Sequence, residues 1–226
     1  MIKERLIAFG DIHGCYEAAK KAIKIAEDIG GLAIFLGDYI DRGPLSIKTL
    51  QLLIEAKQNF PHWIFLRGNH DQMLLDLIEK RSTTNDLGYV LGMNFRYEQT
   101  KKTYQEFKAL DYFNQAEIRK FLNDTNFYFE VDTFIFLHAV LRNTKDVLSK
   151  KSSEELMFNY SYEPEWKGKR FIHGHFLVKE PKFTHNGINI NTECGYGGVL
   201  TGALLDETQS SVYKYFHISE NGKLIS

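Results

Sequence analysis

The feature that most restricts the fold of this chain is a short pattern that occurs five times, in which a polar side chain follows an apolar run. The runs read AFGDIHG, FLGDYIDRG, FLRGNHD, FIFLHAV and FIHGH. In four of them a glycine stands immediately before Asp11, Asp38, Asn69 or His175. In the remaining run, FIFLHAV, the apolar residues are followed directly by His138. Because glycine permits a sharp turn and a close backbone approach, these side chains can meet beyond the carboxyl ends of the strands, where open α/β sheets bind ligands.

The first half of the chain alternates strand-like and helix-like segments. Apolar runs at 5–9, 32–36 and 63–66 predict buried strands. Apolar positions at helical spacing predict one helix over 16–29 and another that begins at Ser46. This βαβαβ order predicts a parallel sheet with right-handed crossovers.

The second half begins with a different pattern. Residues from about Asp71 to Asn123 are polar with scattered aromatic side chains, which predicts a helical insertion around 80–123 beside the sheet. Strand patterns return at 127–138 and continue to the C-terminal end, and the Asn186-Gly187 pair predicts a tight hairpin. We therefore expect a second sheet packed on the first, in a single domain over residues 1–226.

Composition restricts the partners. The chain has 226 residues, 43% of them hydrophobic and 25% charged, with a formal net charge of -1. This balance gives no general reason to expect nucleic acid or an anionic membrane as a partner. No apolar window approaches the roughly 18 residues of a membrane span, and no signal-peptide core follows the first residues, so the expected location is cytoplasmic. Cys15 and Cys194 form no spaced framework and are expected to be free thiols.

The side chains after the strands have the chemistry of metal ligands. Carboxylate, imidazole and amide groups suit Mn, Fe, Zn or Mg. A single Asp after a strand is usually a helix cap or a turn residue. Five such segments together are different, because buried carboxylates cost several kcal/mol unless a positive charge compensates them. Two divalent cations would provide that compensation.

The same segments carry a family resemblance. GDIHG, GDYIDRG and GNHD, followed by HA and GH, resemble the signature series of the calcineurin-like metallophosphoesterases, and more narrowly the phosphoprotein phosphatase branch in its short bacterial and phage form. The resemblance extends from Phe9 to about Leu205. It implies an α/β fold, a four-layer α/β/β/α sandwich with two packed mixed sheets. It also implies two divalent metal ions, Mn first with Fe, Zn or Mg as alternatives, held by Asp11 and His13, by Asp38 as the bridge, and by Asn69, His138 and His175.

Two such metals can hold a hydroxide that attacks phosphorus in line. Arg42 is a candidate phosphate ligand, since its fork of donors suits a phosphate better than a lysine would. His70 is the candidate general acid, with a third metal contact or a helix N-terminal residue as the alternative. Asp41 is the candidate that orients His70, with an ordinary turn or an ion pair to Arg42 as the alternative.

The chain departs from its relatives at one substrate position. Bacterial relatives tend to carry an arginine where this chain has Asn159, so a second phosphate clamp is missing there. Arg142, four residues after His138, is a candidate replacement, and a solvated surface arginine is the alternative. Tyr196 is a candidate substrate contact, and simple packing is the alternative.

The leading expectation is a metal-dependent phosphomonoesterase that acts on phosphoserine and phosphothreonine in proteins, and on small aryl phosphates in vitro. The runner-up is a symmetrical dinucleoside tetraphosphate (Ap4A) hydrolase, or another small phosphoester hydrolase, of the same superfamily. Those enzymes typically lack the aspartate before the arginine of the second motif, so Asp41 favours the protein phosphatase branch. A non-catalytic scaffold is the third possibility, and the complete set of ligands argues against it.

Overall fold

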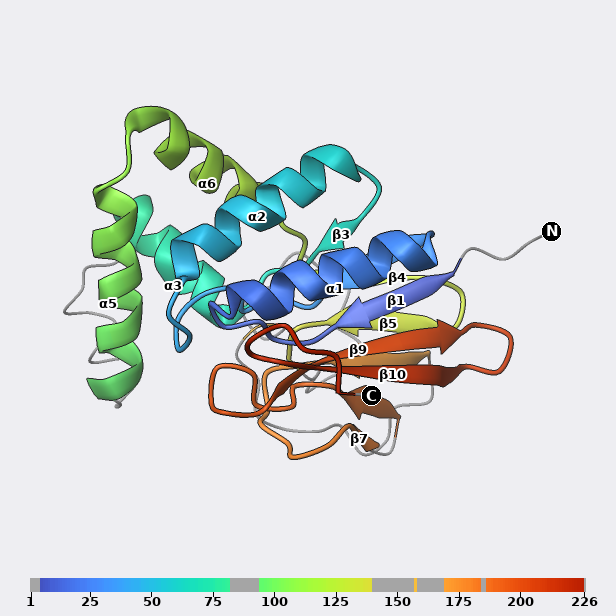
Figure 1. Cartoon of the computed structure of the whole chain (residues 1–226). Helices are drawn as coiled ribbons and strands as arrows, with labels where there is room; N and C mark the ends of the chain where they lie inside the picture. The colour runs from blue at the N-terminus through green and yellow to red at the C-terminus, as the bar shows by residue number, and fades with distance from the viewer. Residues whose placement is uncertain (1–4, 82–93, 140–156, 158–168, 184–185, 226) are drawn as a thin grey trace.

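Two mixed sheets pack face to face, and helices cover the outer face of the first sheet (Figure 1). The computed structural model describes residues 5–81, 94–139, 157, 169–183 and 186–225, with the backbone alone at 94–97. The elements are β1 (Leu6–Phe9), α1 (Tyr16–Ile29), β2 (Leu32–Phe35), α2 (Ser46–Asn59), β3 (Ile64–Phe65), α3 (Asn69–Ile78), α5 (Asn94–Lys108), α6 (Tyr112–Asp124), β4 (Tyr128–Glu130), β5 (Phe134–Leu137), β6 (Arg170–His173), β7 (Lys182–Phe183), β8 (Gly187–Asn189), β9 (Val199–Asp206) and β10 (Ser211–Ser219).

The first sheet has the order β10-β9-β1-β2-β3. β1, β2 and β3 are parallel, which confirms the predicted βαβαβ beginning. The C-terminal strands differ from the prediction, because β9 pairs antiparallel with β1 and β10 pairs with β9. They therefore complete the first sheet and do not extend the second. The register that places Leu6 opposite Leu205 and Ala8 opposite Ala203 aligns apolar side chains on one face.

The second sheet has the order β4-β5-β6-β8-β7. β5, β6 and β8 are parallel, while β4 and β7 pair antiparallel at the two edges. The predicted hairpin around Gly187 is the β7–β8 pair. Two packed mixed sheets with helices confirm the predicted fold class.

The two faces of β1 contact different parts of the core. Leu6 and Ala8 belong to the apolar cluster between the sheets, which includes Phe134 and Phe136 of β5. Ile7 and Phe9 belong to the cluster under the helices, which includes Ala18 and Ala22 of α1. Successive residues of a strand point to opposite faces, so an apolar run without alternation is what a strand between two layers requires.

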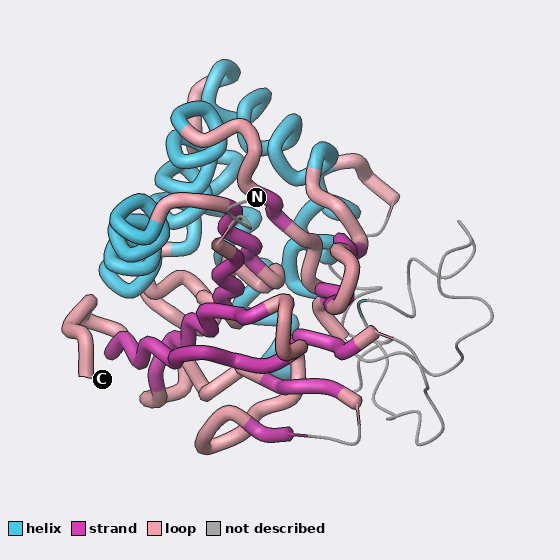
Figure 2. The backbone as a smooth tube through the Cα atoms, turned by 90° about the vertical axis from the view of Figure 1, so that its right-hand side faces the viewer, coloured by secondary structure: helices cyan, strands magenta, loops and turns pink. Residues whose placement is uncertain are grey.

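The insertion predicted around 80–123 is helical in its described part. α5 and α6 pack against α3, and both also contact α2. β1 runs toward the end of the molecule where α3 and α5 lie (Figure 1), and the tube in Figure 2 shows the helices gathered on one side of the strands. None of the described helices combines the length and the apolarity that a membrane span requires. Cys15 and Cys194 are buried and free, as expected.

Candidate metal centre

The candidate metal centre lies where strands of both sheets end. Asp11 and His13 follow β1, while Asp38 follows β2. Asn69 is the first residue of α3, directly after β3 and a short turn. His138 follows β5 and His175 follows β6, which brings the second sheet to the same place. The carboxyl ends of parallel strands in two packed sheets thus supply all of these side chains.

The turns that carry these residues adopt an uncommon backbone conformation. Positive φ angles occur at His13 (47°), Asp38 (51°), Asp41 (68°), Arg42 (68°) and His175 (65°). Residues with a side chain rarely adopt this conformation, which costs on the order of 1–3 kcal/mol each and persists only where the surroundings impose it. Five of the eight described non-glycine residues with positive φ thus lie in the turns that carry the candidate ligands; the other three are Lys80, Glu193 and Ser210.

Two glycines are required because the turns approach the carboxylates closely. A Cβ atom at Gly174 would overlap Oδ1 of Asp11, and one at Gly68 would overlap Oδ1 of Asp38. Glycine is thus the residue that lets each backbone segment reach the neighbouring ligand.

Backbone carbonyl groups orient two of the histidines. Nδ1 of His13 lies 2.9 Å from the carbonyl oxygen of Ile40, and Nδ1 of His138 lies 2.9 Å from that of Leu36. Since a carbonyl only accepts, each Nδ1 carries a proton and donates it, which leaves Nε2 as the ligand atom. Nε2 of His13 lies 3.7 Å from Oδ2 of Asp38, and Nε2 of His138 lies 3.4 Å from the same oxygen. Both imidazoles therefore face Asp38.

The remaining predicted ligands join the same cluster. Oδ1 of Asn69 lies 3.1 Å from Nε2 of His138 and 2.9 Å from Nδ1 of His175. The backbone N–H of His175 donates to Asp11. The structure thus brings together all six residues that were predicted as ligands.

Two groups of these side chains have the spacing of a metal site. His13, Asp38 and His70 each offer one ligand atom within 4.8 Å of the others, and so do Asp38, His138 and His175. Asp38 is common to both groups, which is the arrangement expected of a bridging carboxylate. His70, predicted as a general acid with a third metal contact as the alternative, is itself a member of the first group, whereas Asp11, predicted as a ligand of the first metal, belongs to neither group.

The electrostatics show that the cluster requires positive charge. Burial raises the pKa of Asp11 to about 7, with the charge of Asp38 adding to the effect. Burial alone would raise the pKa of Asp38, but the neighbouring imidazoles, His138 above all, hold it well below its usual value. Burial would lower the pKa of His138, but Asp38 and Asp11 raise it to about 9. Protons on Asp11 and His138 therefore compensate the buried carboxylates, and divalent cations would do the same. The residues present fit a metal centre in donor type, spacing and charge.

Asp41 and His70 form a buried pair beside the cluster. Oδ2 of Asp41 lies 2.6 Å from Nδ1 of His70. Burial would lower the pKa of His70, but Asp38 and Asp41 outweigh it and raise that pKa above its ordinary value. Nε2 of His70 lies 3.4 Å from Nη2 of Arg42. The pair has the geometry predicted for it, and Nε2 of the imidazole lies on the side of the cluster, next to Arg42.

A small cavity of about 30 Å³ opens over the centre. Arg42 and Tyr196 line it together with four of the predicted ligands and His70. The guanidinium carbon of Arg42 lies 5.1 Å from the centre of the Tyr196 ring, a cation–π contact. Two of the three predicted substrate-binding residues thus border the site, while Arg142 lies outside the described residues, as does Asn159.

Four further residues support the centre and were not predicted. Asn191 donates from Nδ2 to Oδ2 of Asp11 at 2.6 Å. Asp71 accepts backbone N–H groups of the turn after β2, and Thr100 and Thr103 of α5 donate to Asp41. Asp71 had a detectable signal, since an acid three residues after a helix cap commonly accepts the N–H of the cap. No local sequence pattern indicates the two threonines, because their contact with Asp41 joins segments that are distant in the sequence.

Comparison with known proteins gives the class of the chain. A family model described as calcineurin-like phosphoesterase matches residues 4–202. A bis(5'-nucleosyl)-tetraphosphatase PrpE [asymmetrical] from Geobacillus sp. (strain WCH70) is 27% identical, with 89% of this chain and 90% of the relative aligned. The chain belongs to the calcineurin-like phosphoesterase family, so its general chemistry is the hydrolysis of phosphoesters.

Solved structures share the fold at low sequence identity. A proposed diadenosine tetraphosphatase superposes with a TM-score of 0.63 at 16% identity, covering 96% of this chain and 94% of the other. A protein serine/threonine phosphatase from Saccharomyces cerevisiae superposes with a TM-score of 0.54 at 13% identity, covering 89% of this chain and 72% of the other. The neighbours thus include the phosphoprotein phosphatase type that the motifs resemble, and at these identities they inform on fold alone.

Proposed function

We propose that the chain hydrolyses bis(5'-nucleosyl) tetraphosphates asymmetrically, to a nucleoside triphosphate and a nucleoside monophosphate. One observation carries the proposal: the similarity to the Geobacillus enzyme extends over nearly the full length of both proteins. This substrate class replaces the phosphoprotein expected first from the sequence, and it corresponds to the runner-up with a different cleavage position.

The metal-binding role is assigned to the six residues of the cluster. Asp38, placed between His13 and His138, would contact both ions, with the others distributed as predicted. When bound, two divalent ions, with Mn the first choice, would lower the pKa of a water molecule and neutralise charge on the phosphate oxygens. Asn191 fixes the orientation of Asp11, and the Ile40 and Leu36 carbonyls fix those of His13 and His138.

The substrate-binding role is assigned to Arg42 and Tyr196. Both border the cavity, and the phenol ring lies against the guanidinium. A guanidinium can bind two oxygens of one phosphate with parallel hydrogen bonds. Tyr196 is 42% exposed, so its ring can hold the Arg42 side chain over the centre while its outer face contacts the polyphosphate or a nucleoside.

A second candidate function is supported by the Asp41–His70 pair. The leaving group in a phosphoanhydride is a phosphate, which departs without much help from an acid. The leaving group in a phosphoserine ester is an alkoxide, which requires a proton. A buried imidazole held by a carboxylate at 2.6 Å is suited to donate that proton. The pair therefore favours activity on alkyl phosphomonoesters in addition.

One experiment separates the two functions. The purified protein, with manganese, is given diadenosine tetraphosphate and a phosphoserine peptide at matched concentrations, and the products are separated by chromatography. We expect faster turnover of the dinucleotide, with ATP and AMP as products. Faster turnover of the peptide would overturn the proposal, and ADP as the sole product would overturn the asymmetrical cleavage. The Asp38→Asn variant, prepared identically, controls for contaminating hydrolases.

A further inference from the structure

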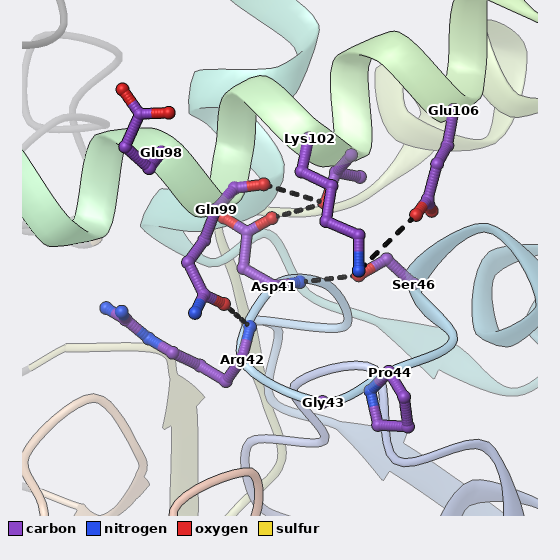
Figure 3. A pocket seen from close by; sticks show the side chains of 10 residues that line it. Asp41, Arg42, Gly43, Pro44, Ser46, Glu98, Gln99, Lys102 and Glu106 are labelled. Atoms are coloured by element: carbon purple, nitrogen blue, oxygen red, sulfur yellow. Dashed lines mark hydrogen bonds and ion pairs between the residues drawn. The ribbon is translucent and has the colours of Figure 1, made fainter.

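One face of α5 lies over the turn that carries Asp41 and Arg42 (Figure 3). Thr100 Oγ1 donates to Oδ2 of Asp41 at 2.5 Å, and Thr103 Oγ1 donates to Oδ1 at 2.6 Å. The Gln99 side chain accepts the backbone N–H of Arg42. Residues three and four apart share a helix face, so a single helix reaches three groups of this turn.

These contacts support a turn whose backbone is in an uncommon conformation. Asp41 and Arg42 both have positive φ angles of 68°, a conformation that external contacts must impose. A cavity of about 420 Å³ lies between the turn and α5, so the turn is not filled in on this side. Ser46 accepts the N–H of Asp41 at 2.9 Å, which fixes the backbone, while the carboxylate is held by His70 and by the two hydroxyls of α5.

The hydroxyl groups, and not only the volume of the threonines, make the contact. Both side chains are buried, where a valine would occupy nearly the same space. Thr103 Oγ1 also lies 3.3 Å from the carbonyl oxygen of Gln99 in its own helix, a common local partner for threonine. The 2.6 Å bond to Asp41 is much shorter, as expected of a hydrogen bond to a charged acceptor.

The two hydroxyls leave the carboxylate one orientation. Oδ1 accepts from Thr103, while Oδ2 accepts from Thr100 and contacts Nδ1 of His70. Rotation of the carboxylate would break both threonine bonds together. Nδ1 of His70 contacts Oδ2 of Asp41. The hydrogen bonds from α5 that orient the carboxylate therefore also orient the imidazole.

We propose that Thr100 and Thr103 are positioning residues, which act through Asp41 to align His70 for proton donation to poor leaving groups. This inference rests on the proposed general-acid role of His70. It assigns a purpose to the helical insertion, since α5 then determines how well the site hydrolyses phosphomonoesters that release an alkoxide or an unactivated phenoxide.

The test measures leaving-group dependence in the full-length protein with manganese. Thr100→Val, Thr103→Val and the double variant are assayed on 4-nitrophenyl phosphate, a good leaving group, and on phenyl phosphate, a poor one. We expect kcat on phenyl phosphate to fall about tenfold or more in the double variant, a modest part of the roughly 100-fold or larger effect of a general acid. The kcat on 4-nitrophenyl phosphate and both KM values should change little. Thr→Ser at both positions should restore the phenyl phosphate rate, because serine retains the hydroxyl.

A matched control distinguishes the loss of a hydroxyl from the loss of this contact. Thr49 of α2 is equally buried, and its hydroxyl has no hydrogen-bond partner among the residues that the structure describes. Thr49→Val should leave both rates unchanged. If the double valine variant does not fold, as judged by thermal unfolding, the single valine variants and the serine pair carry the comparison.

Each other outcome overturns the inference in a recognisable way. Equal slowing of both substrates, or of neither, by the valine variants would show that the threonines do not act through His70. If His70→Asn, run in parallel, still slows phenyl phosphate selectively, the general-acid role stands and only the positioning role is lost. If His70→Asn slows both substrates equally, the general-acid role fails, and the positioning role fails with it.

Discussion

The carboxylate of Asp71 accepts the backbone N–H of Asp38 at 2.8 Å. The same carboxylate accepts the N–H of Tyr39 at 3.0 Å and that of Gly68 at 2.9 Å. Asp38 has a φ of 51°, so its turn needs such external support. A buried acid outside the predicted set of ligands thus holds the residue that both candidate metal groups share.

Asp71→Asn should weaken this support. An amide can accept through one atom only, and its NH2 group would face a backbone donor. We expect the free energy of unfolding to fall by about 1–3 kcal/mol, measured by urea denaturation, and manganese affinity to fall in calorimetry. Asp76→Asn on the same helix removes a partly exposed carboxylate and should lower the free energy of unfolding much less. Equal losses for both variants would show that Asp71 has no special role at Asp38.

Removal of metal should lower thermal stability. A ligand that binds only the folded protein stabilises it by an amount that grows with the free ligand concentration. The stabilisation is about 2.7 kcal/mol when that concentration is about 100 times the Kd. We therefore expect manganese to raise the melting temperature of the chelated protein, and Asp38→Asn to reduce that rise strongly. A full rise in the variant would contradict the bridging position of Asp38.

Arg42→Lys should weaken substrate binding more than it slows turnover. Lysine retains the charge but loses the paired donors and the planar contact with Tyr196. We expect KM for diadenosine tetraphosphate to rise about tenfold, which corresponds to roughly 1.4 kcal/mol. Arg81→Lys, an exposed arginine paired with Asp76, is the matched control and should leave KM unchanged. An unaltered KM in the Arg42 variant would remove Arg42 from the substrate site.

Acid should destabilise the protein through His217. Burial lowers the pKa of this histidine below its ordinary value of 6.5, so the folded state favours the neutral imidazole, which lies 2.9 Å from Thr201 Oγ1. The contribution of His217 to stability is complete above pH 6.5, its ordinary pKa. It is lost as the pH falls from 6.5 through the lower pKa that this histidine has in the folded protein.

His217→Gln should reduce this acid sensitivity. Urea unfolding at about pH 7.5 and about pH 5 brackets the titration of histidine, and the loss between the two should be smaller in the variant. His62→Gln on the surface serves as the control. An identical loss in wild type and His217→Gln would contradict the prediction.

Local patterns in the sequence predicted the elements well but not all of their neighbours. The helix over 16–29 and the start of α2 at Ser46 agree with the structure, because apolar spacing alone defines them. β9 and β10 were recognisable as strands, but the pattern that identifies a strand does not identify its partner. Their place beside β1 depends on the match of Leu205 and Ala203 with side chains nearly 200 positions earlier.

The ligands were more predictable than their supports or the substrate. A glycine and a polar residue after an apolar run mark a ligand locally, whereas the bonds from Thr100 and Thr103 to Asp41 join segments about 60 residues apart. In the sequence Asp41 favours protein substrates, but a relative named as an asymmetrical tetraphosphatase aligns along nearly the whole chain. The presence of Asp41 indicates how His70 is held. It does not identify the part of the substrate that is attached to the leaving oxygen.

The left-handed turns at His13, Asp38, Asp41, Arg42 and His175 have a consequence for engineering. Substitutions that relax such turns are an accessible route to a more heat-resistant chain, and they fall on the side chains that the chemistry needs. Selection for thermal tolerance alone should therefore first lower the turnover rate. Stabilising changes on the outer surfaces of α1 or β10 should leave the turnover rate unchanged.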